Sequence, residues 1–533
     1  MTVLDFGTKL FGFRHFLGVR HYAALHSGFC WRVDSQTMKK CYTFFMGTEE
    51  KNIRIVILGA GISGLSAAYH LHKRSPDVRF QIWDKNSRTG GVLETLHTDK
   101  YQIEQSADNF ITTVPWGLEL CRELGLENEL VQTNPAVRRT YVVRKGRLHL
   151  LPDGFMMMAP TRMWPLAVTP ILSPLGKLRA AMEYFIPRSR DTSDETMANF
   201  VNRRLGREVF ERLVEPLVSG VYAADMEKLS VLATLPRFRE METEYGSLIR
   251  AMRAQMKASK QVRDQSKESG ARYSMFVTLR KGLSHITDTL TERLPAESVQ
   301  LNREAVSLER KTNEHQKEKW LLTDQNGQSE QFDGVIFATP SYETARLLLP
   351  TAPRLGELLA KIEHSGTAIA TFAFSRGQMK KTVRGMGFVV PKIENSPLLA
   401  GSFSSLKYSH RAPADKLLIR IFAGGARAPE MASMPDEELV PILKREMNRV
   451  LKIEGEPEYH VVAHWPRTMP QYHVGHLELV EQIESQIAEI PTVGLAGNAF
   501  HGVGIPNCAR SGELAVDDLL AKMFPNWNAG GSE

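Results

Sequence analysis

A glycine-rich stretch near residue 60 has the residue types and spacing that hold a dinucleotide. Gly59, Gly61 and Gly64 form a G-x-G-x-x-G pattern, with Ile62 and Ser63 inside it. In this pattern the first glycine permits a tight turn, the second lets backbone N–H groups approach a pyrophosphate, and the third lets a helix pack closely on a strand. The partial positive charge at the helix N-terminus complements the phosphate charge. The stretch therefore predicts a dinucleotide site.

The flanking sequence supplies the strand and the helix that this pattern requires. Residues 53–58 are almost all apolar and mostly β-branched, which is typical of a buried parallel strand, and the apolar residues after Gly64 follow helical spacing. A second apolar run, residues 80–83, ends at Asp84. Asp84 lies about 20 residues beyond the glycines, where an acidic residue accepts a hydrogen bond from a ribose hydroxyl. We expect Asp84 to have this role.

The residues after Asp84 distinguish between NAD and FAD. Lys85, Arg88, Gly90 and Gly91 complete a D-x-x-x-R-x-G-G pattern. A second glycine hairpin brings another backbone segment against the cofactor, and a guanidinium group can meet phosphate charge with two hydrogen bonds. Together with the first pattern, this arrangement resembles the glutathione-reductase-like flavoproteins of the amine oxidase type. The resemblance implies FAD as the cofactor.

The end of the chain carries a further element of the same kind. Residues 492–498 form a strand pattern that ends in Gly497 and Asn498, and a glycine-rich loop then leads through Gly504 and Ile505 into an amphipathic helix. In the flavoproteins that the chain resembles, this element closes the flavin pocket, and its helix N-terminus faces the side of the ring where reduction places negative charge. The resemblance implies a hydrogen-bonding role for Asn498.

Three stretches in the middle and late parts of the chain are more specific than any glycine turn. Residues 195–231 contain RRLGREV and GVYAADMEKLS, residues 385–391 and 403–413 read GMGFVVP and FSSLKYSHRAP, and residues 469–476 read MPQYHVGH. With the flavin patterns they are similar to the porphyrinogen oxidases of haem biosynthesis, which act on protoporphyrinogen or coproporphyrinogen. The resemblance extends from about residue 52 to about residue 524.

The resemblance also implies positions that line the macrocycle. These are Val389, Ser402 and Phe422, of which Phe422 could stack on a pyrrole ring, while Ser402 replaces the aliphatic residue usual there. The arginine that pairs with a propionate in the plant and animal enzymes falls on Thr140, and Arg139 is the nearest substitute. Adjacent strand residues point to opposite faces, so Arg139 would face away from the side on which Thr140 lies.

The fold class that follows is α/β, with a Rossmann-like FAD-binding domain of the glutathione-reductase or amine-oxidase type, a mixed-sheet substrate domain and a helical insertion. The first and last cofactor patterns lie far apart in sequence, so both ends of the chain contribute to the FAD domain. The expected segments are an N-terminal extension (1–51), three FAD-binding parts (52–135, 261–345 and 456–525), the helical insertion (136–260), the substrate domain (346–455) and a tail (526–533).

Composition excludes several other classes. The four cysteines have no C-x-x-C spacing, which argues against a disulfide scaffold or a zinc site and favours a reducing compartment, and we expect no metal. No basic run is interleaved with aromatic residues, so we expect no nucleic acid partner. Residues 1–50 are rich in lysine and arginine; they fit a transit peptide less well than an over-extended start before Met46.

The segment 156–187 is rich in Met, Leu, Trp and Pro but too broken to span a bilayer. In the enzymes that the chain resembles, a helical insertion here docks on the bilayer surface; a packed helical subdomain explains the same composition. We expect a cytoplasmic protein. Three further properties stay open: peripheral attachment to the cytoplasmic membrane, contacts with other haem-pathway enzymes, and a homodimer.

The implied reaction is a six-electron, oxygen-dependent oxidation of a porphyrinogen to a porphyrin, with hydride transfer to the flavin and no acid–base residue assigned. The residues Ser106–Phe110 are closer to the Gly-Pro-Asp-Ser-Phe form of Gram-positive-type coproporphyrinogen oxidases than to the animal sequence. Four propionates would also use additional cations. Two alternatives stay open: another flavin amine oxidase-like enzyme, such as an amine oxidase or carotenoid desaturase, and a non-catalytic tetrapyrrole carrier.

Overall fold

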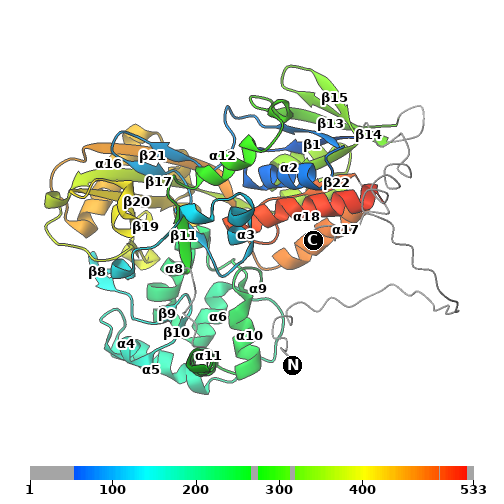
Figure 1. The fold of residues 1–533 in the computed structure, drawn as a ribbon. Coiled ribbons are helices and arrows are strands. Elements are labelled where there is room, and N and C mark those ends of the chain that lie inside the picture. Colours follow the sequence, from blue (N-terminus) through cyan, green and yellow to red (C-terminus); the bar gives the residue numbers. More distant parts are fainter. Residues whose placement is uncertain (1–52, 266–273, 313–317, 491, 525–533) are drawn as a thin grey trace. The chain divides into compact units, whose positions relative to one another are not determined.

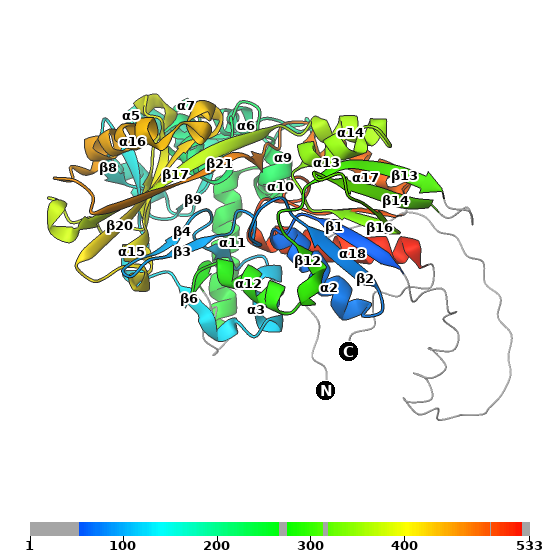
Figure 2. The ribbon, with the colours of Figure 1, turned by 90° about the horizontal axis from the view of Figure 1, so that it is seen from above.

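A computed structural model describes residues 53–265, 274–312, 318–490 and 492–524; the predictions for residues 1–51 and 526–533 lie outside these ranges. A parallel five-stranded sheet with the order β12-β2-β1-β16-β22 forms the first domain (Figures 1 and 2). Its strands are β1 (Arg54–Leu58), β2 (Arg79–Trp83), β12 (Val299–Gln300), β16 (Gly334–Phe337) and β22 (Val493–Leu495). Strand β22 pairs with β16, so this sheet contains strands from both ends of the chain.

Both faces of this sheet are covered, which explains why the strands are continuously apolar. In β1, Ile55 and Ile57 belong to the core on one face, and Val56 and Leu58 belong to the core on the other. The first face packs against α2 (Ile62–Arg74), α3 (Trp116–Glu123), α12 (Ser284–Glu292) and α18 (Ile505–Met523). The second packs against β13 (Ala305–Thr312), β14 (Glu318–Asp324), β15 (Ser329–Phe332), α13 (Ser341–Leu348), α14 (Pro353–Ala360) and α17 (His476–Ala488).

A mixed seven-stranded sheet forms the second domain, with the order β21-β17-β20-β19-β18-β7-β8. The strands are β7 (Thr140–Arg144), β8 (Arg147–Leu150), β17 (His364–Ser375), β18 (Gly387–Val389), β19 (Leu398–Phe403), β20 (Lys416–Gly424) and β21 (Tyr459–Pro470). Helix α16 (Asp436–Leu451) covers one face.

Two parts of this sheet come from segments that the sequence assigns to other regions, the helical insertion and the FAD-binding domain. Strands β7 and β8 lie within residues 136–260, the predicted helical segment, and β21 lies within residues 456–525, the predicted third FAD part. Val142 pairs with Val389, which places the β7–β8 hairpin at the sheet edge. Hairpins of this kind look alike in sequence whichever sheet they join, because pairing with β18 depends on a contact between residues far apart in the chain.

The helical insertion has its own apolar core. It contains α4 (Met163–Val168), α5 (Pro174–Ala181), α6 (Met197–Arg204), α7 (Arg207–Val209), α8 (Glu215–Tyr222), α9 (Val231–Thr234), α10 (Pro236–Tyr245) and α11 (Leu248–Gln265). A fully buried arginine, Arg204, is satisfied by Glu183, Glu242 and backbone carbonyls. Within the ranges that the structure describes, no helix is long and apolar enough to cross a membrane.

Short elements link the three regions. They are β3 (Thr95–His97), β4 (Gln102–Glu104), β5 (Phe110–Ile111), β6 (Leu130–Gln132), β9 (Phe155–Met156), β10 (Ala159–Pro160), β11 (Phe276–Leu279) and α15 (Ser404–Lys407). The loop between β4 and β5, residues 105–109, is important for the site. Ala107 packs against the first core, and the backbone carbonyl of Ser106 accepts a hydrogen bond from Arg420 of β20. This loop therefore connects the two domains.

Candidate functional site: a dinucleotide cradle beside an apolar sheet face

The glycine turn has the conformation that its sequence predicts. Gly59 has φ of +104°, which favours glycine, and a Cβ there would lie 2.8 Å from the carbonyl oxygen of Ala338. A Cβ at Gly64 would overlap the carbonyl oxygen of Gly59. A Cβ at Gly61 would meet no atom within 4 Å, so the backbone at this position is open to a ligand. The first and third glycines thus shape the turn, and the second leaves space in front of it.

Two helix N-termini are available to bind an anion in this part of the chain. Gly61 is the N-cap of α2 and Gly504 is the N-cap of α18, and neither makes a side-chain capping hydrogen bond. The first N–H groups of a helix have no partner within it, and they carry partial positive charge. Ile62, Ser63 and Ile505 lie in these first turns. The uncapped ends and the open backbone at Gly61 fit the pyrophosphate and ring of FAD.

Asp84 supports the glycine turn directly. Its Oδ2 accepts a hydrogen bond from the backbone N–H of Ala60 at 2.7 Å, and its Oδ1 accepts one from the N–H of Asn86 at 2.8 Å. The residue is buried. Asp84 therefore holds the turn that faces the ligand, and its contact with a ribose hydroxyl stays a prediction.

The second glycine hairpin lies against the first. The N–H of Gly90 donates to the carbonyl oxygen of Ala60 at 2.8 Å, and Gly91 has φ of +59°. Arg88 donates to the carbonyl oxygen of Gly91 at 2.7 Å and pairs with Glu94 at 2.9 Å. In this structure Arg88 therefore holds the hairpin together.

Lys85 lies at the edge of the same region. Its Nζ is 3.7 Å from the carboxylate of Glu343, and its side chain is exposed. Phosphate contacts by Arg88 and Lys85 stay predictions, because the groups they contact here belong to the protein.

The C-terminal element is held in place by hydrogen bonds to both sides. Gly497 has φ of +126°, and its N–H donates to Oγ of Ser511 at 2.9 Å. The side-chain amide of Asn498 donates to the carbonyl oxygen of Thr468 at 3.1 Å. Asn498 thus joins the last strand region to β21, and its hydrogen bond to the flavin stays a prediction.

The contact between α2 and α18 was not predicted from the sequence. Oγ of Ser66 donates to the carbonyl oxygen of Ala509 at 2.7 Å, and a Cβ at Gly512 would overlap the carbonyl oxygen of Ser63. The two helices therefore touch backbone to backbone. The small residues Ala509, Gly512 and Ala515, spaced by three in the C-terminal helix, were a signal for this contact.

The structure brings the three predicted macrocycle-lining residues together. Val389 pairs with Ala400, and Ala400 pairs with Phe422. Paired residues share a face of the sheet, and Ser402, two positions after Ala400, shares it too. Helix α8 covers part of this face, since a Cβ at Gly220 would lie 3.8 Å from Cγ1 of Val389.

The predicted arginine does not join this face in the same way. Arg139 is exposed and precedes the first residue of β7. Thr140 pairs with Gly387, which puts Thr140 on the side of Val142 and Val389. Contact between Arg139 and a propionate therefore stays a prediction that the strand geometry does not favour.

A buried cationic cluster beside the apolar face was missed in the sequence. Arg411 and Arg420 are fully buried, and both pair with Asp108, Arg420 at 3.4 Å. Lys407 pairs with Asp108 at 2.9 Å, and burial lowers the pKa of Lys407 to about 7. Burial also lowers the pKa of Arg411 and Arg420, to about 10, so both guanidinium groups stay charged at neutral pH.

This cluster lies next to the predicted substrate wall. Arg420 pairs with Ser402 across the sheet, and its guanidinium carbon is 5.1 Å from the ring centre of Phe422. The sequence signal was a single arginine inside the apolar run 417–423. A charged residue in such a run is buried only with partners. Its partners, Ser106 and Asp108, lie more than 300 positions earlier in the chain, with a separation of 314 residues between Ser106 and Arg420.

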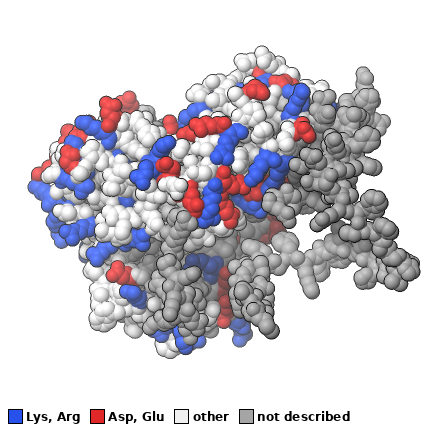
Figure 3. Space-filling view, viewed as in Figure 1, with Lys and Arg blue, Asp and Glu red and all other residues white. Residues whose placement is uncertain are grey.

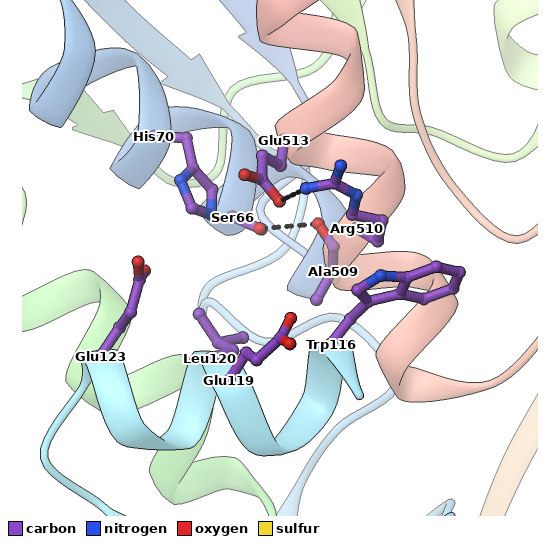
Figure 4. A pocket seen from close by; sticks show the side chains of 9 residues that line it. All are labelled: Ser66, His70, Trp116, Glu119, Leu120, Glu123, Ala509, Arg510 and Glu513. Carbon is purple, nitrogen blue, oxygen red and sulfur yellow. Dashed lines mark hydrogen bonds and ion pairs between the residues drawn. The ribbon is translucent and has the colours of Figure 1, made fainter. Parts of the chain in front are cut away.

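A small cavity also lies between α2, α3 and α18 (Figure 4). Its volume is about 100 Å³, and its lining is polar, with His70 and Ser66 from α2, Glu119 and Glu123 from α3, and an Arg510–Glu513 pair from α18. This volume is too small for a tetrapyrrole, and none of the predicted macrocycle-lining residues takes part. The cavity is therefore not the substrate site.

The buried His476 makes stability depend on pH. Burial lowers the pKa of His476 to about 4, and the ring contacts the carbonyl oxygen of Phe500 at 3.1 Å. Because the folded pKa is below the unfolded value, the unfolded state binds more protons between these two values, and stability falls as pH falls.

When the pH is lowered from about 7 to about 5, the free energy of unfolding falls in the parent protein because His476 must stay neutral in the folded state. In a His476→Phe variant we expect this fall to be smaller by about 2 kcal/mol. Urea titrations of both proteins at the two pH values measure this difference. Parallel losses in the two proteins would show that His476 does not carry the effect.

Comparison with known proteins agrees with this geometry. Residues 62–520 match the model of the flavin containing amine oxidoreductase family. The chain is 33% identical to a coproporphyrinogen III oxidase of Bacillus subtilis (strain 168), over 88% of this chain and 98% of the relative. It is 26% identical to protoporphyrinogen oxidase 2, chloroplastic/mitochondrial, of Arabidopsis thaliana, over 88% and 94% of the two chains.

A solved structure of a protein from Exiguobacterium sp. 255-15, with a provisional assignment as protoporphyrinogen oxidase, has a TM-score of 0.77 and 27% identity. The alignment covers 88% of this chain and 98% of that one. The family match spans α2, most of α18 and all strands of the substrate sheet. With its cradle for a dinucleotide built from both ends, the chain belongs to the flavin containing amine oxidoreductase family.

Proposed function

We propose that this protein is an FAD-dependent oxidase that converts a porphyrinogen to the porphyrin in haem biosynthesis. One observation carries the proposal: Val503, the residue before the N-cap of α18, packs on the same apolar cluster as Val389 and Ala400. The flavin-side loop and the predicted macrocycle wall therefore border the same apolar cluster. The similarity to the coproporphyrinogen III and protoporphyrinogen oxidases supports the same reaction.

The residues of this chain would bind and orient the two reactants. When bound, FAD would supply a hydride acceptor that molecular oxygen can reoxidise. The backbone N–H groups at Gly61 and at the start of α18 would hold its charged parts, and Asp84 would keep the first of these in place. Phe422 and Val389 would contact the apolar macrocycle and exclude water from it. Positioning of this kind is the contribution that we assign to the protein.

Coproporphyrinogen III is the substrate that we favour. It carries four carboxylates, which need cations, and Arg420 lies beside the wall that Ser402 and Phe422 form and shares Asp108 with Lys407. The coproporphyrinogen III oxidase of Bacillus subtilis is also the more similar of the two relatives.

Parallel assays with coproporphyrinogen III and protoporphyrinogen IX test this choice through the fluorescence of the porphyrin product. We expect faster turnover of coproporphyrinogen III. Equal or faster turnover of protoporphyrinogen IX would contradict the choice of substrate, and no porphyrin from either compound would contradict the proposed activity.

An apolar surface of the helical insertion supports attachment to a membrane surface. Large apolar side chains are exposed along α4, α5 and the following turn: Trp164 (75% exposed), Val168, Leu175 (79%), Leu178, Met182 and Phe185 (78%). Exposed apolar groups in such numbers mark a surface that binds a membrane or a protein. Elsewhere, on the face shown in Figure 3, lysine and arginine alternate with aspartate and glutamate. We favour the lipid surface, since Arg162 and Lys177 accompany these apolar side chains in the segment and would meet anionic lipid headgroups.

A Trp164→Ser, Phe185→Ser double variant is expected to bind phospholipid vesicles at least about tenfold more weakly, because burying one large apolar side chain contributes about 1.5–3 kcal/mol. Co-sedimentation with vesicles measures the binding. Leu514→Ser, at an exposed apolar residue of α18, is the control and should bind as the parent does. Equal binding of all three proteins would dismiss this surface.

A further inference from the structure

The two most specific stretches of the sequence meet in the fold and form one joint. We call residues 470–476 (PQYHVGH) the PQYHVGH stretch, and residues 220–230 (GVYAADMEKLS) the insertion stretch. Backbone N–H of Ser230 donates to the carbonyl oxygen of Tyr472 at 2.8 Å, and N–H of Val474 donates to that of Lys228 at 3.0 Å. The joint therefore ties the helical insertion to the end of β21.

The hydroxyl of Tyr472 extends this joint to the flavin-side loop. It donates to the carbonyl oxygen of Asn498 at 2.6 Å and accepts a hydrogen bond from the N–H of Gly502 at 2.8 Å. Tyr472 is buried, and burial raises its pKa, so the hydroxyl stays protonated. A single atom thus bridges two backbone groups of the loop that leads to Gly504 and α18.

A stacked histidine holds the tyrosine ring in this place. The ring centres of His476 and Tyr472 are 4.0 Å apart, with an angle of 13° between the planes. His476 also contacts the carbonyl oxygen of Phe500. The loop 498–502 is therefore held at three backbone groups by two side chains of the PQYHVGH stretch.

We propose that Tyr472 is a positioning residue. It fixes the loop 498–502, so that Gly504 and the N-terminus of α18 face the flavin. Because Tyr472 also belongs to the joint with the helical insertion, the position of this loop depends on the docking of the insertion. The inference rests on the proposed flavin site. The geometry supports a positioning role, because the hydroxyl gives its one proton to the loop and accepts a hydrogen bond from it.

Tyr472→Phe tests the proposal because it removes the hydroxyl and keeps the stacked ring. We expect the N–H of Gly502 to exchange with solvent at least about tenfold faster and FAD to dissociate about tenfold more readily, since one half-buried N–H loses its partner. Hydrogen exchange of the apoprotein and FAD titration measure the two effects. Tyr141→Phe is the matched control, because Tyr141 lies in β7, outside the joint, and loses one hydrogen bond, to the carbonyl oxygen of Arg384.

The control should keep loop exchange and FAD affinity within about twofold of the parent. Equal effects of the two variants on both measurements, or unchanged exchange at Gly502 in Tyr472→Phe, would overturn the inference. If the parent binds no FAD, the proposed function fails, while exchange at Gly502 still decides the role of Tyr472. If Tyr472→Phe does not fold, His476→Phe provides a second test. This variant keeps an aromatic ring stacked on Tyr472 and loses the contact with the carbonyl oxygen of Phe500, so we expect faster hydrogen exchange in the loop 498–502. Unchanged exchange in that loop would also overturn the inference.

Discussion

FAD is expected to bind an Asp84→Ala variant about 10- to 100-fold more weakly than the parent protein. The carboxylate accepts hydrogen bonds from two backbone N–H groups, at Ala60 and Asn86, and the first belongs to the glycine turn. Removing it leaves the buried N–H of Ala60 without a partner and frees the turn to leave the conformation that fits a pyrophosphate. A loss of charged hydrogen bonds of this kind costs about 1.5–3 kcal/mol. Titration of the apoprotein with FAD, followed by flavin fluorescence, measures it.

Asp333→Ala is the matched control for this prediction. The carboxylate of Asp333 accepts a hydrogen bond from the N–H of Arg54 at 2.9 Å, at the opposite end of the same strand, β1. Its loss should affect stability and leave FAD affinity unchanged. Equal FAD affinity in Asp84→Ala and the parent would contradict the assignment of Asp84, and equal weakening in both variants would show that strand stability, not the turn, controls binding.

Gly512→Ala is expected to destabilise the protein by about 2 kcal/mol or more. Helix propensity alone would favour alanine by about 1 kcal/mol. Here the added Cβ would overlap the carbonyl oxygen of Ser63 and lie 2.8 Å from the N–H of Ala67, both backbone atoms that no side-chain rotation can move. Helices α2 and α18 must therefore separate, and this cost exceeds the gain in propensity.

Chemical denaturation of the Gly512→Ala variant measures this effect as a free energy of unfolding. Gly377→Ala is the control, because a Cβ there would meet no atom within 4 Å and its φ is not in the left-handed region. The control should lie within about 0.5 kcal/mol of the parent. A Gly512→Ala variant as stable as this control would show that the two helices are not in backbone contact.

The dinucleotide cradle could be predicted from the sequence because its parts are local. The turn at Gly59, the helix after it and the strand that ends at Asp84 are set by residues close together in the chain. Their pattern of glycine, apolar and acidic residues reports the backbone geometry directly. The macrocycle wall came from the family resemblance, and the shared sheet face of Val389, Ser402 and Phe422 agrees with it.

Features that depend on distant contacts could not be predicted. Asp108 meets Lys407, Arg411 and Arg420 only after the two domains have come together. Likewise the β7–β8 hairpin gives no local sign that it pairs with β18. Gly512 looks like an unfavourable helix residue until Ser63 is placed against it. At Asp108 and Gly512 the sequence shows a residue type that costs energy alone, and the fold supplies its partner.

Anaerobic mixing of the FAD-loaded protein with coproporphyrinogen III tests the central claim most directly. The account predicts that the visible absorption of the flavin is lost as the substrate is oxidised, and that admitting oxygen restores it with formation of fluorescent porphyrin. A flavin that stays oxidised in the presence of excess coproporphyrinogen III and protoporphyrinogen IX would contradict the account.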